Sequence, residues 1–368
     1  MAACCRRTQR LGYKPRGVLL LRGVEKRLGL AARLSRCIRE RRNRQSIEHT
    51  QEEMLRLRMF AIAAGYEDAN DCAKLRHDPV FKMAVGRLPE SGDPLCSQPT
   101  MSRLENAPSK IELARLSGLV TSREAAMIDQ FCDSYRRAPG SIVLDIDDTL
   151  DTVHGHQQLS LFNAHYDERC FLPIHIYEGT TGKPVAVLLR QGSMPAGVEV
   201  RTILKHVIGH IRERWPKVDI VVRGDSHYGR VEAMQWCEQH GVDYIFGFAG
   251  NDVLKAMTAQ ATAALGVKQA ASSAAKLRRF ATLSYAAKRW DRKRRIAARI
   301  EATTKGLDVR YVVTSAAVIS RDSAARQSIS TRGSTAPVAR PRTSSSGTRR
   351  SSPPTGPRAA IQRPTSSG

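Results

Sequence analysis

The sequence has 368 residues and a formal net charge of +24, so we expect two or three domains and an acidic polymer, nucleic acid first, as the partner. Its eight cysteines form no C-x-x-C pair, which argues against a zinc site or a disulfide framework and favours a reducing cytosol. No apolar run approaches a membrane span and the start lacks a signal-peptide core, so we expect a cytoplasmic protein without membrane contact.

The first part of the chain reads as a short leader, residues 1–16, followed by a helical region at 17–135. Arginines crowd the far side of its helical apolar pattern, which marks it as the expected DNA-binding region. A turn-to-helix pattern offers Thr100 or Ser102 as the N-cap of a helix that contains Arg103. Helix starts of this kind often meet phosphates, so Arg103 is a candidate DNA contact. An ordinary helical bundle with a solvated basic face explains any single helix equally well.

The pattern changes at residues 141–157, SIVLDIDDTLDTVHGHQ, where an α/β region begins. Apolar residues carry the start of this stretch into a short buried strand, and Asp145, Asp147 and Asp148 lie at or near its end. Alternation puts Asp145 and Asp147 on one face. Carboxylates this close repel each other unless a cation neutralises them, and Mg²⁺ is the common solution. Acids that merely cap the following turn are the alternative, but three of them exceed what a cap needs.

Strands and helices alternate in the next hundred residues. A long helix from Val198 to Trp215 precedes a buried strand from Val218 to Arg223, which delivers Asp225 to its C-terminal end. A further helix follows, and then a strand from Asp243 to Phe248. An early antiparallel meander, a helix and a second acid-bearing strand predict a mixed α/β sheet. Carboxylates at neighbouring strand ends can converge on one metal pair.

These motifs resemble those of bacterial insertion-sequence transposases with a DDE catalytic domain of group 1, in which His-Gly-x-Gln follows the first acidic motif. The resemblance rests on VLDIDDTLDTVHGHQ, VVRGDSHYGR and YIFGFAGN, in this order, and extends from about Gly17 to Ser315. It implies a ribonuclease-H-like mixed sheet with flanking helices, preceded by the α-helical region. In the family, two Asp and a Glu hold two Mg²⁺ (or Mn²⁺) ions, which activate water, and later a DNA 3′-hydroxyl, for attack on phosphodiesters.

By motif position, Asp147 resembles the first catalytic Asp of the family and Asp225 the second, with Asp145 as a neighbouring metal ligand. The implied partner is double-stranded DNA, as transposon ends and target, and a homodimer is expected in the bacterial cytoplasm at the nucleoid. Three histidines are candidates for assisting the reaction or binding phosphate, although each is more often a structural hydrogen bonder: His154, His156 and His227.

The expected catalytic core covers residues 141–315 and contains a basic insertion at about 251–306. Two strands, Phe280 to Trp290 and Ile296 to Thr303, are predicted there around a basic turn. In the family a comparable insertion helps to hold DNA ends, although a solvated charged hairpin explains the pattern equally well. The candidate DNA contacts of this turn are Lys288, Arg289, Arg292 and Lys293.

A second family offers an alternative. The run Asp145 to Thr149, DIDDT, also matches the D-x-D-x-T strand of haloacid-dehalogenase-like phosphatases. In that hypothesis Asp145 is the nucleophile and Asp147 the general acid/base, acting on small phosphomonoesters. The further acid expected after the later Mg²⁺ motif is absent, because Gly229 and Arg230 occupy that place.

Residues 316–368 differ in composition from all that precedes them. They are rich in Ser, Thr, Arg and Pro, and their single acid is Asp322. The nine Arg and one acid after residue 320 supply +8, which leaves +16 on the rest of the chain. Such a composition cannot bury a core and predicts disorder. The family continues instead to a helix with its catalytic Glu, and Glu301 is a poor substitute, so the chain resembles a transposase with defective catalysis.

A frameshift is our hypothesis for this tail. Residues 337–343, PVARPRT, can be encoded by CCC GTG GCC AGG CCG AGA ACC. Read two bases further on, the same bases spell Arg-Gly-Gln-Ala-Glu-Asn, which is close to the Glu motif of the family. Codon degeneracy leaves freedom in this choice, and a natural disordered basic tail that binds DNA non-specifically is the alternative.

Overall fold

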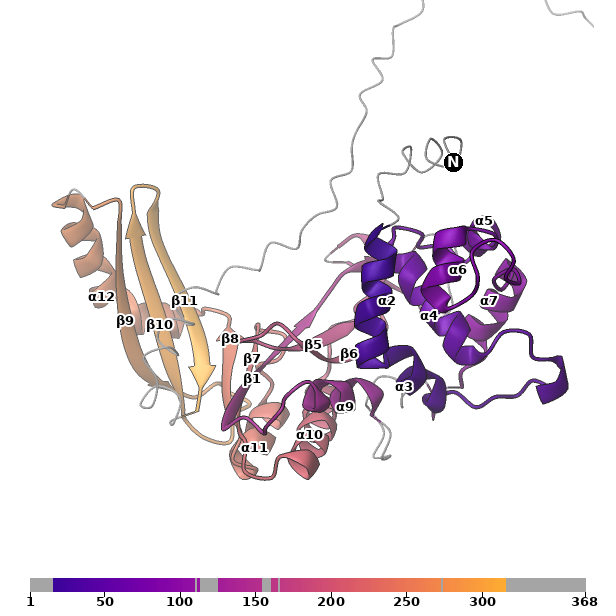
Figure 1. Ribbon diagram of the computed structural model, residues 1–368. Coiled ribbons are helices and arrows are strands. Elements are labelled where there is room, and N and C mark those ends of the chain that lie inside the picture. The colour runs from indigo at the N-terminus through magenta and orange to yellow at the C-terminus, as the bar shows by residue number, and fades with distance from the viewer. Residues whose placement is uncertain are drawn as a thin grey trace, which may run out of the picture.

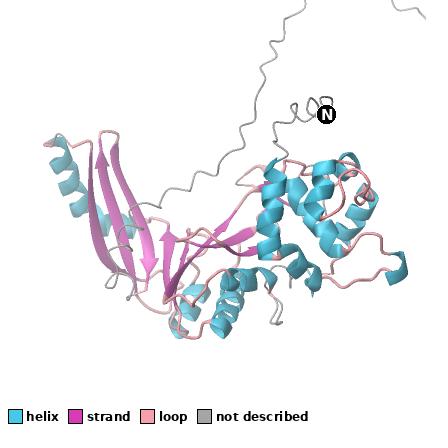
Figure 2. Cartoon of the chain, in the orientation of Figure 1, coloured by secondary structure: helices cyan, strands magenta, loops and turns pink. Residues whose placement is uncertain are grey.

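The structure is a computed structural model, and it divides into a helical region and a long sheet with helices beside it (Figures 1 and 2). The residues it describes are 16–109, 111–112, 125–153, 160–164, 166–272 and 274–315. The predicted tail at 316–368, most of the leader, and both His154 and His156 therefore lie outside the described residues. No helix of the described part is long and apolar enough to cross a membrane.

The helical region forms because its apolar residues recur at helical spacing and polar side chains cap the helices. The Thr50 hydroxyl accepts a hydrogen bond from the Glu53 N–H, and Asp78 accepts from the N–H groups of Val80 and Phe81. The helices of this region are α2 (Arg16–Leu28), α3 (Leu30–Cys37), the 3-10 helix η2 (Arg44–Ser46), α4 (Gln51–Ala63), α5 (Asp71–Leu75), α6 (Pro79–Val85) and α7 (Gln98–Asn106).

The start of α7 corrects the predicted cap. The N-cap is Ser97 instead of Thr100 or Ser102, and Pro99 lies in the first turn. Proline is favoured there because its missing N–H has no intrahelical partner to lose. The Ser97 and Thr100 hydroxyls contact each other at 3.1 Å. Thr100 is therefore already inside the helix.

The main sheet has eight strands in the order β6-β5-β1-β7-β8-β11-β10-β9. Strands β1, β7 and β8 are parallel, and the other neighbouring pairs are antiparallel. This confirms the predicted ribonuclease-H-like mixed sheet preceded by a helical region. The strands of this sheet are β1 (Ser141–Asp148), β5 (Ile174–Glu178), β6 (Pro184–Leu188), β7 (Asp219–Gly224), β8 (Asp243–Phe248), β9 (Lys276–Tyr285), β10 (Arg294–Thr303) and β11 (Gly306–Thr314). A small second sheet, in the order β2-β4-β3, is built from β2 (Asp151–Thr152), β3 (Leu161–Asn163) and β4 (Glu168–Phe171).

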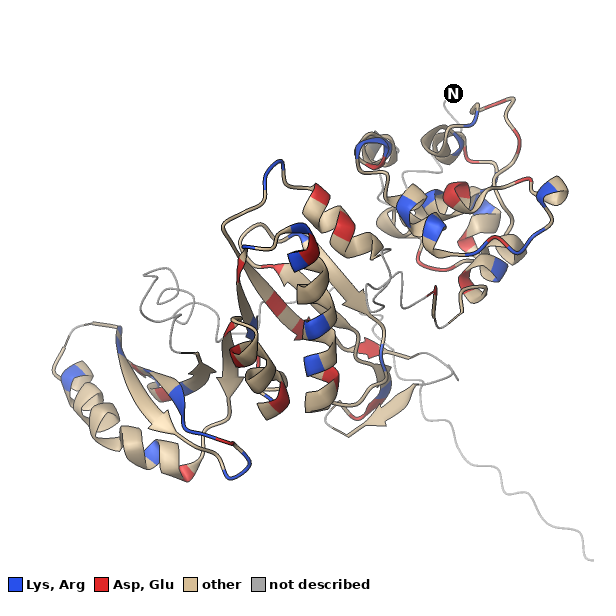
Figure 3. Cartoon of the chain, turned by 90° about the horizontal axis from the view of Figure 1, so that it is seen from below, with Lys and Arg blue, Asp and Glu red and all other residues tan. Residues whose placement is uncertain are grey.

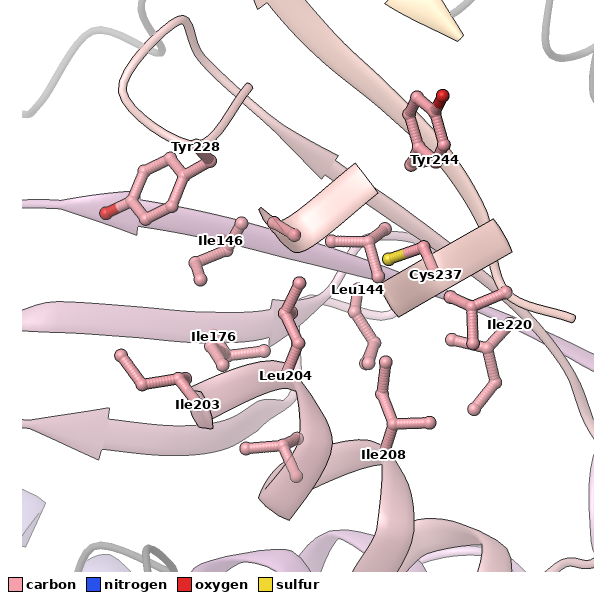
Figure 4. Packing of buried hydrophobic residues seen from close by; sticks show 14 of the residues in the cluster. Leu144, Ile146, Ile176, Ile203, Leu204, Ile208, Ile220, Tyr228, Cys237 and Tyr244 are labelled. Atoms are coloured by element: carbon pink, nitrogen blue, oxygen red, sulfur yellow. The ribbon is translucent and has the colours of Figure 1, made fainter. Parts of the chain in front are cut away.

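Helices cover the face of the sheet that carries Ile142, Leu144 and Ile146 (Figures 1 and 4). These side chains are almost fully buried against apolar residues of α10, including Leu204 and Ile208. Seen from below, α10 lies in front of the sheet (Figure 3). Because side chains alternate along a strand, Asp145 and Asp147 belong to the opposite face. The covering helices are α9 (Ala126–Asp133), α10 (Gly197–Arg214) and α11 (Val231–Gln239).

The insertion differs from its prediction. Its first part is a helix, α12 (Asp252–Ala270), which we had not predicted, and β9 lies a few residues before the strand expected at Phe280–Trp290. The strand expected at Ile296–Thr303 is confirmed, because β10 contains all of it and ends at the same residue. The helix packs on β10 through Leu265, Ile300 and Ala302. Alanines make up much of α12, and alanine has the highest helix propensity. The insertion thus adds two strands, β9 and β10, and one helix to the main sheet, beyond β11, which joins them to β8.

Glu238 at the end of α11 ties this extension to the core. Its carboxylate accepts two hydrogen bonds from the Arg294 guanidinium, at 2.8 and 3.0 Å, and one from the Tyr244 hydroxyl at 2.7 Å. Arg292 contacts the same carboxylate. The Arg294 side chain is only 3% exposed, so its charge depends on this carboxylate and on Asp291.

We therefore predict that Glu238→Gln destabilises the fold by about 3 kcal/mol, because breaking a buried ion pair leaves an uncompensated charge. The control is Asp308→Asn, whose partner Arg310 is about half exposed, and which should cost less than about 1 kcal/mol. Urea unfolding at pH 7 measures both. Equal losses for the two variants would contradict the buried role of Glu238.

Candidate active site

Asp147 and Asp225 lie next to each other at the ends of two parallel strands. The last paired residues of β1 and β7 are Ile146 and Gly224, so the two acids occupy the next position on each strand. A Cβ on Gly224 would stand 3.0 Å from side-chain atoms of both Ile146 and Tyr228. A larger residue would therefore require Ile146 or Tyr228 to shift by a few tenths of an ångström, just before Asp225.

The two carboxyls disfavour each other's charge. Burial is the largest cause that raises the pKa of Asp147, to about 6, and the charges of Asp225 and Asp148 add to it. The Asp147 side chain is nevertheless open to solvent at the surface. Burial is also the main cause of the raised pKa of Asp225, with Asp148 contributing. Among the described residues, neither Asp147 nor Asp225 forms an ion pair with Lys or Arg.

Asp148 lies on the helix-covered face of the sheet, and its side chain contacts two residues that follow Asp225. Its side chain is 6% exposed, and one oxygen contacts both His227 Nδ1 and the donating Tyr228 hydroxyl, each at 3.1 Å. The His227 backbone N–H donates to Asp225 at 2.8 Å, and its ring lies 3.7 Å from the same carboxylate. His227 therefore links the acid of β1 to the acid of β7. Burial and the Asp148 charge raise the pKa of the Tyr228 hydroxyl, which stays protonated as a donor.

Asp145 has a different environment from Asp147, although both belong to one face. Its two oxygens accept hydrogen bonds from Nε and Nη2 of Arg223, at 2.6 and 2.7 Å, across the β1–β7 pair. Gly179 makes room for this pair, since a Cβ there would stand 2.5 Å from Arg223 Nη2. The Asp145 charge is therefore matched by a cation, which leaves it poorly suited to the metal and nucleophile roles considered for it.

The chemistry of Asp147 and Asp225 fits a divalent cation, because both are hard oxygen donors whose charges no Lys or Arg of the described chain neutralises. In the part of the chain that the structure describes, no three His, Cys, Asp or Glu side chains are grouped so that they could hold a metal ion. Glu301 does not complete the pair: it lies on β10, 7% exposed, with Lys276 and Arg278 as ion-pair partners.

The basic turn precedes β10, which three strands separate from β1. Cross-strand pairing leads from Arg295 through Thr314, Ile245 and Arg223 to Asp145. The turn before β10 projects from this row away from Asp147. Its four predicted DNA contacts are exposed, although Arg292 is also an ion-pair partner of Glu238: Lys288, Arg289, Arg292 and Lys293.

Arg103 is also separate from the acids, because it lies exposed on α7 in the helical region. Two residues of the site had not been singled out. Tyr228 follows Asp225 by three residues, within one turn. Burial raises the pKa of the Tyr166 hydroxyl, and the nearby charges of Asp148, Asp225 and Asp147 raise it further. A tyrosine soon after an acid was the only local signal for Tyr228, and the sequence held none for Tyr166.

The raised pKa of Asp147 predicts a pH-dependent stability. The folded chain binds this proton more tightly than an unfolded Asp, whose pKa is near 3.8, so the stabilisation is complete below about pH 4 and is lost as the pH rises to about 6. Without added metal, Asp147→Asn should be more stable than the wild type at pH 7 by about 1 kcal/mol, allowing for solvent screening. Unfolding at pH 4 and pH 7 measures this, and an equal difference at both pH values would contradict it.

Comparisons with known proteins show which family the chain belongs to. A family model described as transposase DDE domain group 1 matches residues 15–341, which runs past Ser315, where we expected the resemblance to end. The cryo-EM structure of the piggyBac transposase synaptic complex with hairpin DNA is similar at 10% identity and a TM-score of 0.35. That match covers 82% of this chain and 61% of the other, and no curated protein matches. The phosphatase alternative is not favoured. The chain belongs to the family of transposases with a DDE domain of group 1.

Proposed function

We propose that the chain is the transposase of an insertion sequence, with Asp147 and Asp225 as its catalytic acids and double-stranded DNA, as transposon ends and target, as its substrate. The observation that carries this proposal is the family match over residues 15–341. The adjacent ends of β1 and β7 support it, because they bring the two motif acids together. A homodimer and association with the bacterial nucleoid belong to the same proposal.

In this proposal Asp147 and Asp225 hold Mg²⁺ or Mn²⁺. When bound, the ion supplies charge neutralisation at the phosphodiester and lowers the pKa of the attacking water or hydroxyl. The protein's part is to orient the two carboxylates. The Asp148 N–H donates to Asp147 at 2.9 Å and the His227 N–H donates to Asp225 at 2.8 Å, so each acid has one oxygen fixed by backbone. The His227 ring contacts both Asp148 and Asp225 and so joins the two strand ends.

We propose in addition that this chain cleaves DNA poorly or not at all, because its third acid is missing. Glu301 is paired with Lys276 and Arg278, and Asp322 is the single acid in the sequence after Ser315. Two carboxylates bind a metal pair less tightly than three and position it less well. DNA binding would survive, since it depends on cations in other parts of the chain. The frameshift at 316–368 explains the loss of the acid.

The metal site is tested by titrating Mn²⁺ into the wild type, Asp147→Ala and Asp225→Ala by calorimetry. Each variant should lose at least about tenfold in affinity, because each removes one of two charged ligands. The matched control is Asp219→Ala, which removes an exposed acid from the opposite end of β7. Unchanged affinity in both site variants would rule out the proposed ligands.

The missing acid is tested with a chain whose residues from 316 onward are replaced by the translation of the other reading frame, the one that gives the Glu motif at residues 337–343. That chain should cleave transposon ends in Mg²⁺, while the present chain should not. Its own Glu→Gln variant should be inactive, which separates the acid from a general effect of the new tail. Metal-dependent cleavage by the present chain, or a gene whose other frame encodes no Glu, would defeat the proposal.

A further inference from the structure

A hollow in the helical region carries a second cluster of charge, far along the chain from the acids. Its volume is about 190 Å³. Helices α2, α4 and α6 surround it, and these three helices pack against one another. Three of its lining residues are basic and the other three form a small apolar floor: Arg22, Lys26, Arg56, Ala84, Val85 and Gly86.

Two of the three cations of this hollow are not balanced by acids of the described residues. Arg22 and Lys26 lie one helical turn apart on α2, where two like charges repel each other. Neither has an ion-pair or hydrogen-bond partner within the described ranges. Arg56 is paired with Glu52, and this pair leaves the other two charges unmatched.

Acids nearby are committed to other partners. Glu25, on the same helix, is 5% exposed and accepts hydrogen bonds from the N–H groups of Leu30 and Ala31 at the start of α3. Glu53, on α4, is paired with Arg87. Arg22 and Lys26 are exposed, so an anion could reach both of them, and it would relieve the repulsion between the two unmatched charges.

Resting on the proposed function, we propose that this hollow binds a backbone phosphate of double-stranded DNA. The Arg22 guanidinium offers a planar fork of N–H donors and Lys26 a compact charge, a combination that suits phosphate oxygens. The three floor residues carry no carboxylate, and the Glu52 carboxylate is already paired with Arg56. Lys and Arg occur on several helices of the region (Figure 3), but these two share one hollow. This contact is distinct from Arg103 and from the β9–β10 turn.

The test measures binding of a DNA duplex over a range of salt concentrations for the wild type, Arg22→Ala/Lys26→Ala and Arg27→Ala. The pocket variant should lose about tenfold in affinity at low salt, and its slope of log affinity against log salt should fall by about 1. Arg27 is the matched control, because it lies next to Lys26 on α2, is exposed and does not line the hollow. Its replacement should change affinity about twofold or less. Circular dichroism checks that all three fold.

Two outcomes would overturn the inference. If the pocket variant binds DNA as tightly as Arg27→Ala, the hollow does not hold a DNA phosphate, while binding by the wild type still supports the proposed function. If inorganic phosphate raises the melting temperature of the wild type and not of the pocket variant, with DNA affinity equal in both, the hollow is a site for a free anion instead. A wild type that binds no DNA at low salt would contradict the proposed function itself.

Discussion

The parallel pairing of β1 with β7 is the constraint on which the candidate site depends. Its register sets Ile146 opposite Gly224, and one position further on it sets the acid of one strand beside the acid of the other. One position before, it sets Asp145 opposite Arg223. The same ladder of backbone hydrogen bonds therefore places Asp145 beside a cation, Arg223, and two positions further on places Asp147 beside another acid, Asp225. A slip of one residue would exchange the faces of every side chain on β1.

The pairing also decides which acid keeps an unsatisfied charge. Arg223 matches Asp145 with two charge-assisted hydrogen bonds, the strong form of this contact. Asp148 is buried but has His227 and Tyr228 as donors. Of the described acids, only Asp147 and Asp225 combine raised pKa values with access to solvent. The strand end thus holds acids in three different electrostatic states within a few residues.

Local patterns predicted the elements that carry the acids, and long-range pairing decided the rest. The apolar run before Asp147 and the run before Asp225 are each read from a few neighbouring residues, so both strands were found. The Arg223 partner of Asp145 and the far position of the β9–β10 turn depend on strand order and register, which no single segment encodes. Helix α12 was missed because its Ala and Lys content was read as charge and not as helix propensity.

The extension of the sheet is attached unevenly, which has a mechanical consequence. Strands β9 and β10 share ten paired positions and β10 and β11 share nine, but β11 is joined to β8 at only four, from Tyr311 to Thr314. The three outer strands and α12 therefore form a stiff unit, called here the paddle, which is joined to β8 along a short line of pairing, called here the seam. Force applied to the tip of the paddle would concentrate at that seam, one strand away from β7 and Asp225. The Glu238 contacts brace the seam at one end, so it would yield first at the other.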